Sequence, residues 1–169
     1  SRYRNLYLFT LATGLKSGEV FGATWDCYEE EQHLFYVRQR LKLIDSNYKI
    51  KGEFHVGTFN SYNHTIFLSS FAIAILRDTR TSQLKYKIDR SSNWDEHDYI
   101  FTEQDGFHVS IANLYRHNRI IREKVGVSYF NLTLLRNAYA MYGFQSGANL
   151  KTMMDSFGII EPKNIVRYW

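Results

Sequence analysis

The first third of the chain passes from a helical to a strand-like pattern of apolar residues. Residues 3–13 carry apolar side chains at helical spacing, and the segment stops at Gly14, a typical residue after a helix. Ser17 is placed to cap a second, short helix at 18–23. Residues 34–43 then alternate, which predicts a strand with one buried side. The apolar residues of that side are Phe35, Val37, Leu41 and Leu43.

The strand pattern continues at 48–56 and 64–68, which predicts a three-stranded antiparallel meander with turns near 45–47 and 57–63. A serine, Ser69 or Ser70, then caps a long helix that runs to about Lys87. A polar loop at 91–98 and a short apolar segment at 99–101 follow it.

The rest of the chain is predicted to be helical, at about 110–125, 133–145 and 149–157, with the last helix ending at Gly158. Pro162 is placed to open a final short helix that contains Tyr168. No repeat, low-complexity stretch or linker divides the sequence. We therefore expect one domain over residues 1–169, mainly α with a small three-stranded antiparallel sheet (α+β).

Composition narrows the class of protein. The 169 residues are 44% apolar, enough for a buried core rather than a disordered chain. The longest apolar run, at 71–76, is far too short to cross a membrane, and no leader opens the chain. The single cysteine, Cys27, excludes an internal disulfide framework and a cysteine-based zinc site. A reducing, cytoplasmic location is expected.

The net charge of +4 and the pI near 9.1 amount to a mild basic excess. This excess is compatible with a nucleic-acid partner but is shared by many proteins without one. The sequence also begins inside a helical pattern, so we expect a further, DNA-binding domain upstream of it.

Two motifs in the first half of the chain carry a family resemblance. TGLKSGEVFGATWDCY at 13–28 and TFNSYNHTIFL at 58–68 resemble the first two conserved boxes of the tyrosine recombinase (phage integrase) catalytic domain. Glu19 occupies an acidic position of the first box, but Lys16 stands where the family has a catalytic arginine. In the second box, Thr58 stands where the family has its catalytic lysine.

Two motifs in the second half continue the resemblance, which covers essentially the whole chain. The third box is His-x-x-Arg in the family; here Arg136 keeps the arginine and Thr133 replaces the histidine. In the fourth box, Ile159 replaces a histidine or tryptophan, and Tyr168 follows it at the spacing of the family's nucleophile. The resemblance therefore implies catalytic roles for Tyr168, Arg136 and Lys16, with substitutions at Thr58, Thr133 and Ile159.

The resemblance implies a reaction on duplex DNA that uses no metal and no cofactor. In the family a tyrosine oxygen attacks a DNA phosphate, forms a 3′-phosphotyrosine bond and releases a 5′-hydroxyl. Two arginines stabilise the charge that builds on the phosphate, and a lysine protonates the leaving oxygen. A lysine lacks the planar fork of an arginine, and losing a general acid costs about a hundred- to ten-thousand-fold in rate. The substitutions therefore indicate a degenerate active site.

DNA contacts are expected from a set of basic side chains other than those at the catalytic positions. One group lies on the polar face of the segment at 34–43, a second on the helix at 110–125, and a histidine lies at a position that the family often fills with arginine. They are Arg38, Arg40, Lys42, Arg116, Arg119, Arg122 and His64.

Three functions remain open from the sequence. The first is a DNA-binding integrase-like domain with impaired catalysis, derived from a prophage or mobile element. The second is an active recombinase that uses Lys16 and substitute donors. The third is a relic kept as a regulatory or protein-interaction module. The resemblance further implies a homo-oligomer on DNA, with no membrane partner and no small-molecule cofactor.

Overall fold

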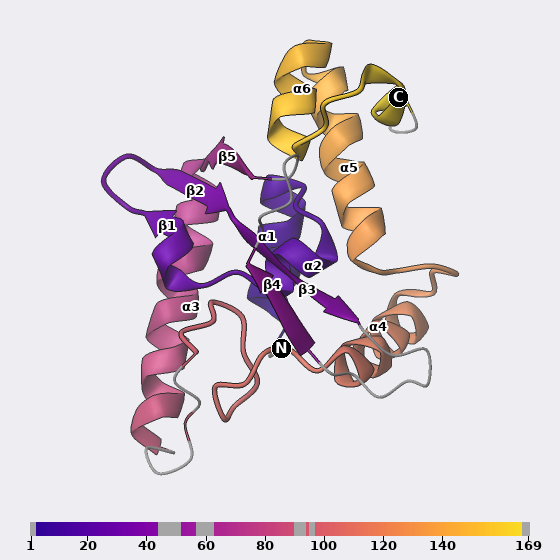
Figure 1. Ribbon diagram of the computed structural model, residues 1–169. Coiled ribbons are helices and arrows are strands. Elements are labelled where there is room, and N and C mark those ends of the chain that lie inside the picture. Colours follow the sequence, from indigo (N-terminus) through magenta and orange to yellow (C-terminus); the bar gives the residue numbers. More distant parts are fainter. Residues whose placement is uncertain (1–2, 44–51, 57–62, 90–93, 95–96, 167–169) are drawn as a thin grey trace.

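α1 (Arg4–Thr13) is the helix on which much of the chain is packed, since α3 (Ser70–Asp89) and α5 (Leu132–Gln145) both lie against it. The computed structural model describes residues 3–43, 52–56, 63–89, 94 and 97–166 and, at 42–43 and 52–56, the backbone alone. In Figure 1, α1 lies at the centre, with α3 on one side and α5 on the other. The fold is mainly helical with a small three-stranded antiparallel sheet, as the sequence predicts.

The first helix and the turn after it follow the sequence pattern closely. α1 ends at Gly14, whose left-handed backbone (φ 66°) closes the helix with a hydrogen bond from its N–H to the Thr10 carbonyl oxygen. α2 (Ser17–Phe21) begins one residue before the predicted start, so Lys16, not Ser17, is its N-cap residue. The Glu19 carboxylate accepts the Lys16 backbone N–H at 2.7 Å. This half of a capping box starts the helix without a side-chain oxygen from residue 17.

The predicted strand at 34–43 is two strands in two different sheets. β2 (Leu34–Val37) lies between β1 (Tyr28–Glu29) and β5 (His64–Phe67), whereas β3 (Gln39–Leu43) pairs with β4 (Gly52–Val56). The meander was therefore wrong: the strand breaks at Arg38, and its two halves take different partners. The predicted buried side chains Phe35, Val37 and Leu41 are buried, and the side chain of Leu43 lies outside the described residues.

The break at Arg38 lets β3 turn onto α2. A Cβ atom added to Gly18 would lie 2.8 Å from the Leu41 carbonyl oxygen, and one added to Gly22 would lie 2.9 Å from the Leu41 nitrogen. Only glycine allows backbone to approach backbone this closely. The two glycines thus set the position of β3, and with it the position of Arg40.

The C-terminal helices form where the sequence predicts them because each has a side-chain cap. Oxygens of Ser110, Asn131 and Asn149 accept backbone N–H groups in the first turns of α4 (Ile111–Val125), α5 and α6 (Leu150–Phe157). The helix predicted at Pro162 is a single 3-10 turn, η3 (Pro162–Asn164), and Tyr168 lies outside the described residues.

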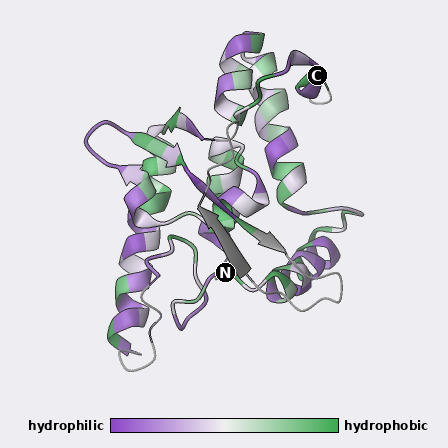
Figure 2. Cartoon of the chain, in the orientation of Figure 1, coloured by the Kyte–Doolittle hydropathy of each residue, from purple (hydrophilic) through white to green (hydrophobic). Residues whose placement is uncertain are grey.

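The described residues bury two apolar clusters. The larger joins α1, α2, the strands and α3; the smaller lies between α5 and α6 and contains Met153, Phe157 and Ile165. Figure 2 shows hydrophobic and hydrophilic residues mixed along α3, in keeping with a helix that packs one side on α1. No described helix has the length and apolarity needed to cross a bilayer, and the described residues gather no group of metal-ligating side chains.

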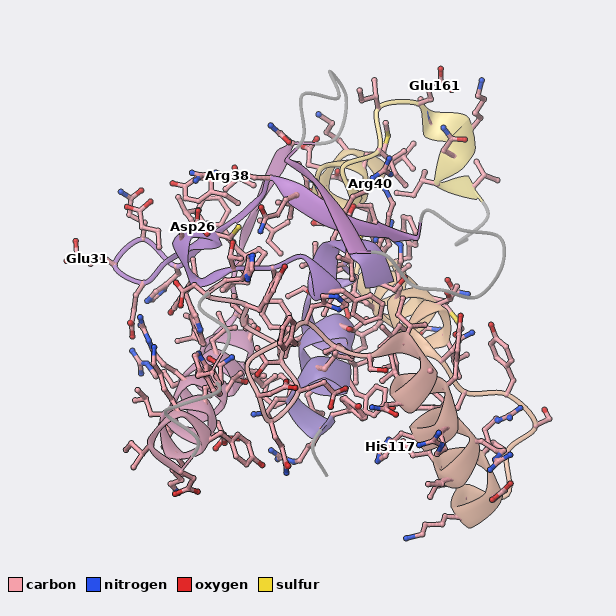
Figure 3. The ribbon with its side chains drawn as sticks, turned by 60° about the horizontal axis from the view of Figure 1, so that its bottom comes forward. Asp26, Glu31, Arg38, Arg40, His117 and Glu161 are labelled. Atoms are coloured by element: carbon pink, nitrogen blue, oxygen red, sulfur yellow. The ribbon has the colours of Figure 1, made fainter. Side chains whose placement is uncertain are left out.

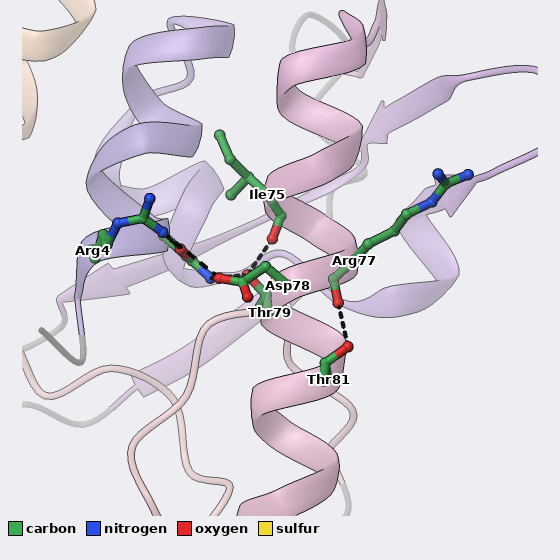
Figure 4. A network of polar contacts seen from close by, with 7 residues as sticks. Arg4, Ile75, Arg77, Asp78, Thr79 and Thr81 are labelled. Carbon is green, nitrogen blue, oxygen red and sulfur yellow. Dashed lines mark hydrogen bonds and ion pairs between the residues drawn. The ribbon is translucent and has the colours of Figure 1, made fainter.

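Polar contacts fasten α1 to α3 at the edge of the larger cluster (Figure 4). Asn5 donates from Nδ2 to Asp78 at 2.8 Å and to Thr79 Oγ1 at 3.1 Å. Arg4 lies 3.7 Å from the same Asp78 carboxylate. The Thr79 hydroxyl in turn donates to the Ile75 carbonyl oxygen, so this end of α1 is held to the middle of α3.

Candidate functional site

A cavity of about 530 Å³ opens between α2, β3, α4 and the first turn of α5. Three residues singled out in the sequence, Lys16, Arg40 and Thr133, line it together. They come from three separate elements, so their convergence is a property of the fold and not of the motifs alone. The lining also includes Glu19, Tyr115, Asn118 and Asn131.

Lys16 is held by the buried carboxylate of Glu19. The Lys16 Nζ lies 3.5 Å from Glu19 Oε1, while Oε2 accepts the Lys16 backbone N–H. The side chain of Lys16 keeps 34% of its surface exposed and that of Glu19 only 5%. Glu19 therefore fixes the cation at the wall of the cavity while leaving part of it open to a ligand.

The two arginines of the predicted strand face different surroundings. Arg40 lines the cavity from β3, at the level where that strand touches α2. Arg38 is exposed, and its guanidinium carbon lies 4.5 Å from the centre of the Tyr36 ring. Figure 3 shows Arg38 on the side of Asp26 and the β1–β2 hairpin, apart from Arg40. The structure thus separates residues that the alternating pattern had placed on one face.

Arg136, one turn after Thr133 on α5, is not among the residues that line the cavity. Its side chain is 4% exposed, and one guanidinium nitrogen donates to the carbonyl oxygen of Gly14, two residues before Lys16. Its guanidinium carbon lies 3.9 Å from the centre of the Phe157 ring. The arginine of the third box therefore contacts both the first and the fourth.

The other box positions lie in different surroundings. Thr133 lies one turn before Arg136 on α5, at the cavity, whereas Ile159 packs on the smaller apolar cluster. His64, on β5, lies against the turn after α6, where a Cβ atom at Gly158 would be 2.5 Å from its Nδ1. Tyr168, Thr58 and the side chain of Lys42 lie outside the described residues.

The basic residues of α4 lie outside the cavity lining. Arg116 and Arg119 are exposed; Arg116 donates to Asn113 Oδ1 at 3.4 Å, and Arg119 lies 3.7 Å from Glu123. Arg122 is half-buried near the end of the same helix. Arg116 and Arg119 thus form an exposed cationic surface of α4, separate from the cations of the cavity.

Asn118, a polar residue buried in the cavity wall, was not predicted as a site residue from the sequence. A signal for it existed. Ile111, Leu114 and Asn118 follow the spacing of the buried face of α4, so an amide occupies a position that the helical pattern reserves for an apolar side chain. Tyr7 of α1 donates its O–H to Asn118 Oδ1 at 2.7 Å, and burial raises the pKa of that phenol.

Comparison with known proteins places the chain among proteins of one kind. No family model matches the chain. A tyrosine recombinase XerC-like protein of Caldanaerobacter subterraneus subsp. tengcongensis is 28% identical over 165 residues, covering 93% of this chain and 42% of that protein. The chain therefore spans less than half the length of this relative.

Solved structures share the fold. The Tn1549 transposon integrase, in complex with transposon right end DNA, matches with a TM-score of 0.80 at 13% identity, over 99% of this chain and 54% of that chain. The XerA recombinase matches with a TM-score of 0.74 at 14% identity, over 99% of this chain and 52% of that chain. The chain is therefore similar in sequence to a XerC-like tyrosine recombinase and shares the fold of the Tn1549 integrase and XerA, which together support a tyrosine recombinase catalytic domain.

Proposed function

We propose that this domain binds duplex DNA and holds a backbone phosphate at the cavity lined by Lys16, Arg40 and Thr133. The observation that carries the proposal is the convergence of two cations and the N-terminal turn of α5 on one cavity. Cationic side chains and the N–H groups of a helix start are the usual protein ligands of DNA phosphates. The solved integrase of similar fold was studied in complex with transposon DNA, which supports the same class of partner.

The proposal also states that the domain cleaves DNA strands poorly. Lys16 carries charge but offers a single ammonium in place of a bidentate fork, and Glu19 neutralises part of that charge. Thr133 supplies a hydroxyl where the family has an imidazole, and Ile159 supplies no donor. Fewer groups are then available to stabilise the charge that develops on the phosphate when a tyrosine attacks it.

A suicide-substrate assay tests the catalytic part of the proposal. Duplexes that the protein binds are first selected from a random library, and nicked versions are then incubated with wild type and with Tyr168→Phe. The nick lets the short 5′-hydroxyl fragment diffuse away, so a covalent protein–DNA adduct accumulates if Tyr168 attacks. We expect little or no adduct from wild type, and more adduct when Lys16→Arg, Thr133→His and Ile159→His are combined.

The results separate the three functions. Rapid, Tyr168-dependent trapping by wild type would replace impaired catalysis with an active recombinase. A folded protein that retains no duplex even at low salt would indicate the regulatory or protein-interaction relic. Selective DNA binding without an adduct is the outcome that the proposal requires.

A further inference from the structure

Asn118 places one buried amide group in the wall of the cavity. The residue lies on α4, is 5% exposed and lines the same space as Lys16 and Arg40. A buried amide oxygen needs a donor from the protein, whereas Nδ2 of Asn118 is not among the described side-chain atoms that are both buried and without a hydrogen bond, so it is open to the space beside it. The partners of this amide therefore indicate what the cavity holds.

The oxygen of the amide has its partner inside the protein. Tyr7 donates its O–H to Asn118 Oδ1 at 2.7 Å, and Nδ1 of His117 lies 3.0 Å from the same Tyr7 oxygen. Figure 3 shows His117 on the neighbouring position of α4. This contact turns the oxygen of Asn118 toward α1, and the planar amide then directs Nδ2 to the other side.

The amide nitrogen is the polar group that Asn118 offers to the cavity. Within the described part of the chain, Nδ2 of Asn118 makes no hydrogen bond. An amide N–H₂ only donates, so the group that completes it must accept. Lys16 and Arg40 line the same cavity and favour an acceptor that carries negative charge.

We infer that Asn118 is a DNA-contacting residue of this site, whose Nδ2 donates to a phosphodiester oxygen held by Lys16 and Arg40. The inference rests on the proposed function and adds an uncharged donor to it. Asparagine commonly contacts DNA phosphates in this way. Tyr7 orients the amide. Asn118 then supplies a neutral donor to a cavity in which Thr133 stands at the position of the family's third-box histidine.

The test compares Asn118→Leu with Asn113→Leu, in binding to the duplex selected above. Asn113 lies on the same helix but is not among the lining residues. Loss of a hydrogen bond to a charged acceptor is expected to weaken binding roughly ten- to a hundred-fold at position 118, with little change at position 113. The salt slope should stay at the wild-type value, because an uncharged donor releases no counterions.

A second measurement does not depend on a variant that folds. In ¹H–¹⁵N spectra of the wild type, the side-chain amide signals of Asn118, assigned through their own Cβ and Cα resonances, should shift strongly when the duplex is added. Tyr7→Phe should weaken binding less than Asn118→Leu, since it frees the amide to rotate without removing it.

The outcomes distinguish this inference from the proposed function. If the duplex is not bound, or if Lys16→Ala and Arg40→Ala leave binding unchanged, the proposed function fails. If those two variants weaken binding while the Asn118 signals stay in place and Asn118→Leu binds like wild type, only the assignment of Asn118 is overturned.

Discussion

Arg136 donates a hydrogen bond to the carbonyl oxygen of Gly14, and this contact ties α5 to the turn that carries Lys16. The same guanidinium covers the ring of Phe157 at the end of α6. One buried side chain thus joins residues of the first, third and fourth boxes. The arrangement explains how motifs more than a hundred residues apart are brought to one place.

Replacing Arg136 by lysine should lower the free energy of unfolding by about 1–3 kcal/mol, because an ammonium cannot bond the Gly14 carbonyl and cover the Phe157 ring together. Urea denaturation measures the loss. The control is Arg119→Lys, an exposed position on α4, where a change within about 0.5 kcal/mol is expected. Equal stabilities of the two variants would contradict the joining role of Arg136.

Gly14→Ala should be more costly than Gly126→Ala, although both glycines have positive φ angles, 66° and 73°. Each variant bears the backbone cost of a left-handed alanine, about 1–2 kcal/mol. Only at Gly14 would the new Cβ also meet a neighbour, at 2.4 Å from Cδ1 of Tyr139; nothing lies within 4 Å at Gly126. Thermal unfolding of the pair isolates the cost of moving Tyr139, and matching melting temperatures would show that the ring yields freely.

Gly18→Ala should destabilise the protein by about 1–3 kcal/mol and weaken DNA binding, because the new methyl group would press on the backbone of β3. The control, Gly143→Ala in α5, meets only the flexible end of Met153, with Cβ 2.7 Å from Sδ. There the higher helix propensity of alanine should leave stability unchanged or raise it by up to about 1 kcal/mol. A Gly18→Ala protein as stable as Gly143→Ala would mean that β3 does not need its close contact with α2.

Tyr7 predicts a loss of stability at alkaline pH. Burial raises the pKa of its phenol above the ordinary value near 10, so the folded chain keeps a proton that the unfolded chain releases. Its contribution is complete below pH 10 and is lost as pH rises from there toward the raised value, at up to about 1.4 kcal/mol per pH unit. Urea denaturation from pH 9 to about pH 11.5 measures it. Tyr7→Phe should show a shallower decline than wild type; identical declines would exclude Tyr7 as the source.

The helices were predictable because their signals are local. Caps such as Ser69, Ser110 and Asn149 hydrogen-bond within three residues of themselves, and Gly14 ends its own helix, so no distant contact decides them. The pairing of strands is different. Whether residues 34–43 form one strand or two depends on Gly18 and Gly22, which admit β3 to α2, and the alternation of apolar residues carries no sign of that contact.

The candidate site could be predicted only at the positions that belong to the family motifs. They located Lys16, Thr133 and Arg136, but not how these are used: Arg136 contacts the Gly14 carbonyl, and Lys16 is held by Glu19. Asn118 belongs to no box and was missed. Its role depends on Tyr7, which lies 111 residues away in the chain and meets it only in the fold.

The salt dependence of duplex binding tests the central claim, that Lys16 and Arg40 hold a DNA phosphate, most directly. Binding constants are measured between about 50 and 200 mM salt for wild type, Lys16→Ala and Arg40→Ala. The control is Arg77→Ala, at an exposed arginine of α3 that is paired with Glu30 at 3.0 Å. Loss of one phosphate contact should reduce the slope of log K against log salt by about 0.9 for each cavity variant and leave Arg77→Ala at the wild-type slope. Wild-type slopes and affinities for Lys16→Ala and Arg40→Ala would contradict the claim.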